Sequence, residues 1–79
     1  MTDYKNSDAW RIFSHNMKWL RNHYKYSKEK MAETLGITVE MIDEIEDGSI
    51  PDSLTVQIFF KIHKHFSIKP KDIVGIYFM

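Results

Sequence analysis

The stretch 28–47 reads K-E-K-M-A-E-T-L-G-I-T-V-E-M-I-D-E-I-E-D, and it contains two short helical patterns. The apolar positions of these patterns are Met31, Ala32, Leu35, Ile42 and Ile45. Their spacing places one apolar face on each helix. Gly36 lies between the patterns and can adopt the positive φ that ends a helix. Ala32 is small enough to let a second helix approach closely. The stretch therefore predicts two crossing helices joined by a tight turn.

Further helical patterns flank this stretch. Ser7 or Asp8 can cap a first helix that runs to about Tyr24. Ser27 caps the helix that begins at Lys28, and Thr38 caps a helix over 39–47 that ends before Gly48. The buried face of the first helix is expected to consist of Trp10, Phe13, Met17, Leu20 and Tyr24, spaced by three and four residues.

Two more helices are predicted after the turn residues at 49–53. The first covers about 55–66, and the last covers 70–74 with Pro70 at its first position. The core candidates of the helix over 55–66 are Val56, Phe59, Phe60, Ile62 and Phe66. The chain has room for one small domain over 1–79. The prediction is an all-α domain of five helices with a central pair over 28–47.

Composition narrows the classes of function. The chain has 79 residues, no cysteine and a hydrophobic fraction of 43%, so a packed core without disulfides or thiolate metal sites is expected. His63 and His65 point to different sides of a helix and cannot chelate one metal ion together. We expect no cofactor, no metal and no enzymatic activity, because a bundle this small offers neither a sizeable pocket nor a glycine-rich phosphate loop. Without a signal peptide or membrane span, the expected location is the cytoplasm.

Charge is distributed unevenly along the chain, although eleven basic and eleven acidic residues give a net charge of zero. No lysine or arginine occurs between Met31 and Phe60. That segment carries seven acidic residues: Glu33, Glu40, Asp43, Glu44, Glu46, Asp47 and Asp52. A nucleic-acid-binding domain is ordinarily basic. The acidic segment therefore argues against ordinary DNA binding.

The pair of helices over 28–47 has the helix-turn-helix layout, in which the second helix usually lies in the major groove of DNA. In this context the chain resembles the phage-repressor-like (Cro/CI, XRE-type) helix-turn-helix domains. The matching stretches are NMKWLR at 16–21, YSKEKMAETLGIT at 26–38, IEDG at 45–48 and FFKIHKHFSIKPKDI at 59–73. The resemblance implies a lambda-repressor-like five-helix fold and binding of double-stranded DNA.

The resemblance also implies roles for individual residues. Arg21 matches an arginine that typically pairs with a glutamate at the position of Glu46. Lys28 matches a position that commonly contacts the DNA backbone, and it either contacts phosphate or lies free in solvent. The base-reading positions correspond to Val39, Glu40, Asp43 and Glu44, with Met41 beside them. Including both flanks, the expected DNA-binding residues are Lys28, Thr38, Val39, Glu40, Met41, Asp43 and Glu44.

Two functions follow from these observations. The first is a sequence-specific DNA-binding transcriptional regulator that reads an operator with the helix over 39–47, where acidic side chains could accept from cytosine N4. The alternative is an antirepressor-like interaction module whose acidic third helix binds a basic protein partner. The apolar tail 75–79 either folds back on its own domain or pairs with a second copy. The homodimer is preferred because regulators of this kind usually bind paired half-sites.

Overall fold

A computed structural model describes residues 8–79, and these residues form five helices and no strand. The helices are α1 (Asp8–His23), α2 (Lys28–Leu35), α3 (Val39–Glu46), α4 (Gln57–Phe66) and α5 (Pro70–Ile73). The predicted all-α class with five helices is confirmed. The cap predicted at Ser7 lies outside the described residues.

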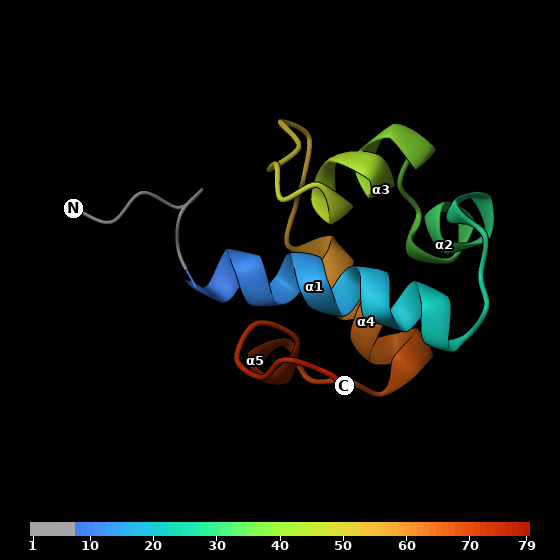
Figure 1. Ribbon diagram of the computed structural model, residues 1–79. Coiled ribbons are helices and arrows are strands. Elements are labelled where there is room, and N and C mark those ends of the chain that lie inside the picture. Colours follow the sequence, from blue (N-terminus) through green and yellow to red (C-terminus); the bar gives the residue numbers. More distant parts are fainter. Residues whose placement is uncertain (1–7) are drawn as a thin grey trace.

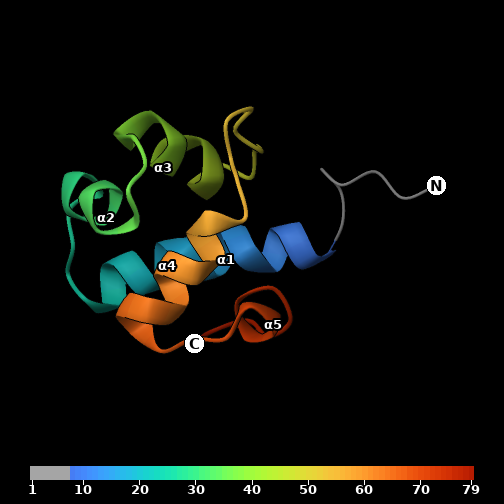
Figure 2. The ribbon, with the colours of Figure 1, turned by 180° about the vertical axis from the view of Figure 1, so that it is seen from behind.

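Helix α1 crosses the centre of the molecule. In both views it lies between α3 on one side and α5 on the other (Figures 1 and 2). Helix α2 packs against α3 and α4, and α4 also packs against α5. The C-terminal residues return to the α5 side of α1 (Figure 1). The surface of α3 and the C-terminal tail are therefore separated by the thickness of α1.

One hydrophobic core joins all five helices. Its fully buried members are Phe13, Met17, Leu20, Met31, Leu35, Ile42, Ile45, Ile62 and Ile73, with Ala32 and Ile58 nearly so. The buried face of α1 contains three of the five residues predicted for it, while Trp10 is half-buried. The prediction for Tyr24 was wrong, because this ring is 46% exposed. It lies one residue beyond the end of α1 and packs beside Phe66 at the edge of the core.

The face that α4 turns to the core differs from the predicted one. Ile58, which was not predicted, is buried together with Ile62, whereas Val56 and Phe60 are 68% and 65% exposed. The predictions for Val56 and Phe60 were wrong. The helix begins at Gln57, two residues later than expected, and apolar residues surround its first turn. Periodicity in such a turn cannot decide which side faces the core.

The tail folds back through the side chain of Asn16, which is fully buried on α1. Its Nδ2 atom donates to the carbonyl oxygens of Ile73 and Ile76 at 2.9 and 2.7 Å. Its Oδ1 atom accepts from the amide of Phe78 at 2.8 Å. The Phe78 ring contacts Trp19 edge to face. Within a single chain the tail therefore folds back on its own domain, which is one of the two predicted alternatives. Even so, Ile76, Tyr77 and Met79 remain exposed.

The helices of residues 8–79 do not include one long and apolar enough to cross a membrane.

Candidate nucleic-acid interface

Helices α2 and α3 are joined by a turn whose geometry is specified locally. The Ser27 hydroxyl accepts from the amide of Lys30 at 3.0 Å and begins α2. Gly36 ends α2 with a φ of +70°, and the next amide, of Ile37, donates back to the carbonyl of Ala32. The Thr38 hydroxyl accepts from the amide of Met41 and begins α3. The caps predicted from the sequence are the caps of this helix-turn-helix unit.

Helix α3 is fixed to α1 at its C-terminal end. The guanidinium of Arg21 donates from Nε and Nη2 to the two carboxylate oxygens of Glu46, at 2.7 and 3.0 Å. The hydrogen bond to Glu46 raises the pKa of Arg21 above its ordinary value. The indole of Trp10 donates to the carbonyl of Gly48 at 2.9 Å, just after α3. These contacts, together with buried Ile42 and Ile45, set the face that α3 presents outward.

The outward face of α3 is acidic. Glu40 and Glu44 are exposed, and Asp47 is exposed at the end of the helix. Asp43 is about half exposed. The four acids occur at i, i+3, i+4 and i+7, which is a single stripe along a helix. The stripe contains three of the predicted base-reading residues, so those three side chains are brought together on one surface.

The remaining predicted residues contribute less surface. Val39 and Met41 are partly buried, and Val39 packs against the core. The Sδ atom of Met41 lies 3.7 Å from the hydroxyl of Ser53, which connects α3 to the loop before α4. Thr38 is exposed, but its hydroxyl oxygen serves the helix cap. Apolar contact with a base is therefore restricted to the exposed edges of Val39 and Met41.

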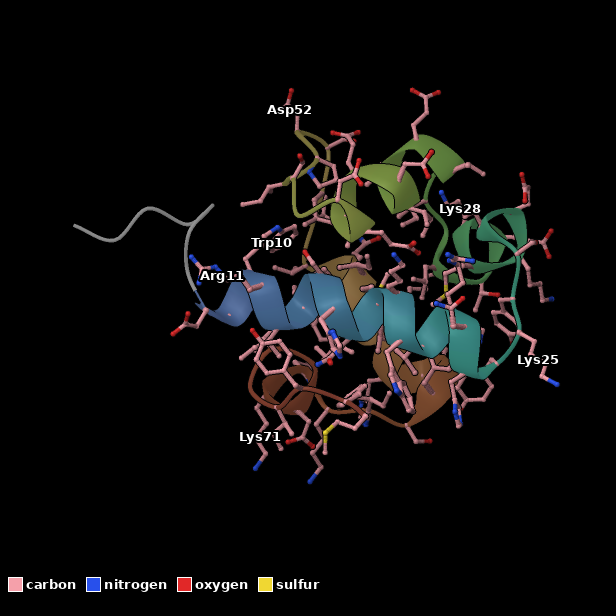
Figure 3. The ribbon with its side chains drawn as sticks, viewed as in Figure 1. Trp10, Arg11, Lys25, Lys28, Asp52 and Lys71 are labelled. Atoms are coloured by element: carbon pink, nitrogen blue, oxygen red, sulfur yellow. The ribbon has the colours of Figure 1, made fainter. Side chains whose placement is uncertain are left out.

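Lys28 is neither free in solvent nor directed only outward. Its ammonium group forms an ion pair with the carboxylate of Asp43 and so joins α2 to α3. Figure 3 shows Lys28 at the side of α2 that is near α3. The hydrogen bond to Asp43 raises the pKa of Lys28 above its ordinary value. A residue expected to contact phosphate is thus joined to a residue expected to read bases. In this conformation the ammonium of Lys28 and the carboxylate of Asp43 contact each other instead of DNA.

The ion pair between Lys28 and Asp43 was not predicted from the sequence. The resemblance supplied the pairing of Arg21 with Glu46, because that pairing recurs in the family, but it supplied none between positions 28 and 43. The sequence does contain a signal for this pair, because Lys28 and Asp43 carry opposite charges on two helices that are predicted to cross. Only the crossing geometry shows that the start of α2 meets the middle of α3.

The five-helix arrangement and the capped turn between α2 and α3 define a helix-turn-helix domain. A helix-turn-helix family model matches residues 17–73. The chain therefore belongs to the phage-repressor-like (XRE-type) helix-turn-helix family. Over 57 residues it is 40% identical to the uncharacterised HTH-type transcriptional regulator YgzD of Bacillus subtilis (strain 168), covering 72% of this chain and 83% of that relative. No solved structure matches the chain.

Proposed function

We propose that this chain is a sequence-specific DNA-binding transcriptional regulator that places α3 in the major groove of an operator. The observation that carries the proposal is the way in which α3 is fixed to the rest of the domain. Its inner side is fixed by Ile42, Ile45 and the Arg21–Glu46 pair, while Glu40 and Glu44 on its outer side are exposed. The family membership and the description of the relative as a transcriptional regulator support it.

Acidic side chains restrict how such a helix reads DNA. A carboxylate accepts a hydrogen bond from cytosine N4 and offers no donor to guanine O6 or N7. Glu40 and Glu44 therefore favour cytosine at the base pairs they face, and the edges of Val39 and Met41 favour a thymine methyl group. The exposed face of α3 contributes no cation, so affinity from neutralised phosphates has to come from other elements.

A gel shift at low salt tests the proposal. The probe is the DNA upstream of the chain's own gene, with random DNA of equal length as the control. Specific retention is expected well below about 10 μM protein, since specific sites usually bind at 10⁻⁸–10⁻¹¹ M. Equal retention of both probes, or retention of neither at that concentration, would contradict the proposal.

The second candidate is a module that binds a basic protein through the same surface. It is favoured by one observation, the stripe of four acids on the outward face of α3. Exchanging Glu44 for Gln separates the two functions. The exchange should strengthen general DNA binding by removing repulsion from phosphates, whereas it should weaken a complex held by complementary charge. A basic partner whose affinity falls on this exchange would favour the second candidate.

We further propose that the regulator forms a homodimer through its tail. Ile76, Tyr77 and Met79 are exposed beside backbone that Asn16 holds in place. Because the tail and α3 lie on opposite sides of α1, such a contact leaves α3 uncovered (Figure 1). Light scattering should give a dimer for the unchanged chain and a monomer for the variant Ile76→Ser with Met79→Ser. A monomer at all concentrations of the unchanged chain would remove this part of the proposal.

A further inference from the structure

A groove of about 490 Å³ lies between the turn that joins α2 to α3 and the start of α4. Its polar lining comes from three separate parts of the fold. Thr38 contributes from the start of α3, Ser53 and Thr55 from the loop before α4, and Gln57 and Lys61 from α4 itself. Among the described residues no acid lines this groove. It thereby differs from the neighbouring outward face of α3.

Lys61 supplies the positive charge of the groove. Its Nζ atom lies 3.7 Å from the position that a Cβ atom would occupy on Gly36, so the ammonium group rests against the turn. Within residues 8–79 no carboxylate forms an ion pair with it. Lys28, on the other side of the same helix pair, is neutralised by Asp43. The two lysines therefore differ in their availability to an anion.

The other polar groups of the groove are placed to donate. The Thr38 hydroxyl oxygen accepts from the amide of Met41, and the Thr55 hydroxyl oxygen accepts from the amide of Gln57 at 3.4 Å. Each hydroxyl therefore keeps its hydrogen for another acceptor. The side-chain amide of Gln57 offers two more donors. The groove also borders the first turns of α3 and α4, whose helix dipoles favour negative charge.

We propose that this groove binds a phosphate group through Lys61 and the hydroxyls of Thr38 and Thr55. An anion with several oxygens matches a donor set that contains one cation and hydroxyls converging from different segments. The phosphate belongs either to the DNA backbone beside the bases that α3 faces, or to a free phosphate or phosphorylated small molecule. The first source rests on the proposed DNA-binding function, and the second is independent of it.

The salt dependence of DNA affinity tests the first source. Lys61→Gln removes the charge, and Lys64→Gln is the matched control, because Lys64 lies on the same helix but outside this groove. Each phosphate contact contributes about 0.9 to the slope of log K against log salt. The slope should become shallower by about 0.9 in Lys61→Gln and change much less in Lys64→Gln. Equal slopes in the two variants would rule out the DNA phosphate.

Titration of the unchanged chain with inorganic phosphate, followed by amide NMR, tests the second source. Saturable shifts at Gly36, Thr38 and Thr55 that disappear in Lys61→Gln identify a phosphate site even where the chain binds no DNA. Their absence, together with equal salt slopes, overturns the proposal. If the chain binds no DNA, the proposed function fails, and this titration alone decides whether the groove binds phosphate.

The same amide spectra show whether Lys61→Gln is folded. If it is not, Thr55→Val replaces it in the phosphate titration, since this exchange removes one hydroxyl of the groove and nearly keeps the side-chain shape. The salt slope is then compared between the unchanged chain and Lys61→Arg, which keeps the charge, and Lys64→Gln. A weaker response to phosphate in Thr55→Val supports the site, whereas an unchanged response contradicts it.

Discussion

Arg21 holds Glu46 with two parallel hydrogen bonds, of 2.7 and 3.0 Å, that join α1 to the last residue of α3. The same guanidinium donates to the carbonyl of Tyr26 at 3.3 Å, just before α2 begins. One side chain thus connects α1, the segment just before α2 and the end of α3. The planar fork of an arginine suits this task, because a lysine cannot make two parallel bonds to one carboxylate.

Replacement of Arg21 by Met should lower the free energy of unfolding by about 3 kcal/mol, because Glu46 would be left in a site where its side chain is only 8% exposed. Arg11→Met is the control. Arg11 pairs with Asp8 at 3.8 Å, with both side chains largely exposed, and its loss should cost less than about 0.5 kcal/mol. Urea unfolding of both variants measures the difference. Equal small losses would show that the Arg21–Glu46 pair stabilises no more than a surface pair.

Asn16 should contribute as much to the free energy of unfolding as a buried apolar residue. Asn16→Ala removes three hydrogen bonds and leaves the tail backbone without those partners, so we expect a loss of about 3 kcal/mol at about 1 kcal/mol for each bond. Asn22→Ala, at an exposed position on the same helix, should change stability by less than about 0.5 kcal/mol. Thermal unfolding measures both. Faster proteolysis of the tail in Asn16→Ala alone would show that the loss arises there.

Helix boundaries around the turn could be predicted because their causes are local. The hydroxyls of Ser27 and Thr38 and the positive φ of Gly36 act within four residues, so the sequence displays them directly. The orientation of α4 depends instead on what lies across the core. Ile58 and Phe60 are both apolar and two positions apart, and only the packing of α4 against the rest of the core decides that the first is inside.

This difference gives a direct test of the α4 orientation. Ile58→Ala should destabilise by about 2–5 kcal/mol, as expected for truncation of a buried isoleucine. Phe60→Ala removes a larger side chain that is 65% exposed and should cost less than about 1 kcal/mol. The ranking is checked by urea unfolding. The reverse order would mean that α4 is rotated from the orientation described above.

The candidate nucleic-acid interface could likewise be predicted only in part from the sequence. Glu40 and Glu44 could be assigned to the outer face of α3 from helical spacing, and both are exposed. The pairing of Lys28 with Asp43 could not be assigned, since fifteen residues and a turn separate the two side chains. Lys61 likewise reaches the groove beside Gly36 from a different helix. Contacts between helices depend on crossing geometry that no single helical pattern contains.

The Lys28–Asp43 pair leads to the last prediction, which concerns how this domain binds DNA. Asp43→Asn removes one negative charge from α3 and also releases Lys28, whereas Glu40→Gln removes one charge from the same face without releasing a lysine. Both variants should bind DNA more tightly than the unchanged chain, because repulsion from phosphates is reduced. Asp43→Asn should in addition gain one phosphate contact.

That contact is measurable as salt dependence. The slope of log K against log salt should become steeper by about 0.9 in Asp43→Asn, and much less so in Glu40→Gln. Adding Lys28→Gln to Asp43→Asn should return the slope to its original value, because the released ammonium is then absent. If the two single exchanges change the slope equally, Lys28 does not reach a phosphate, and its pairing with Asp43 serves only to hold α2 against α3.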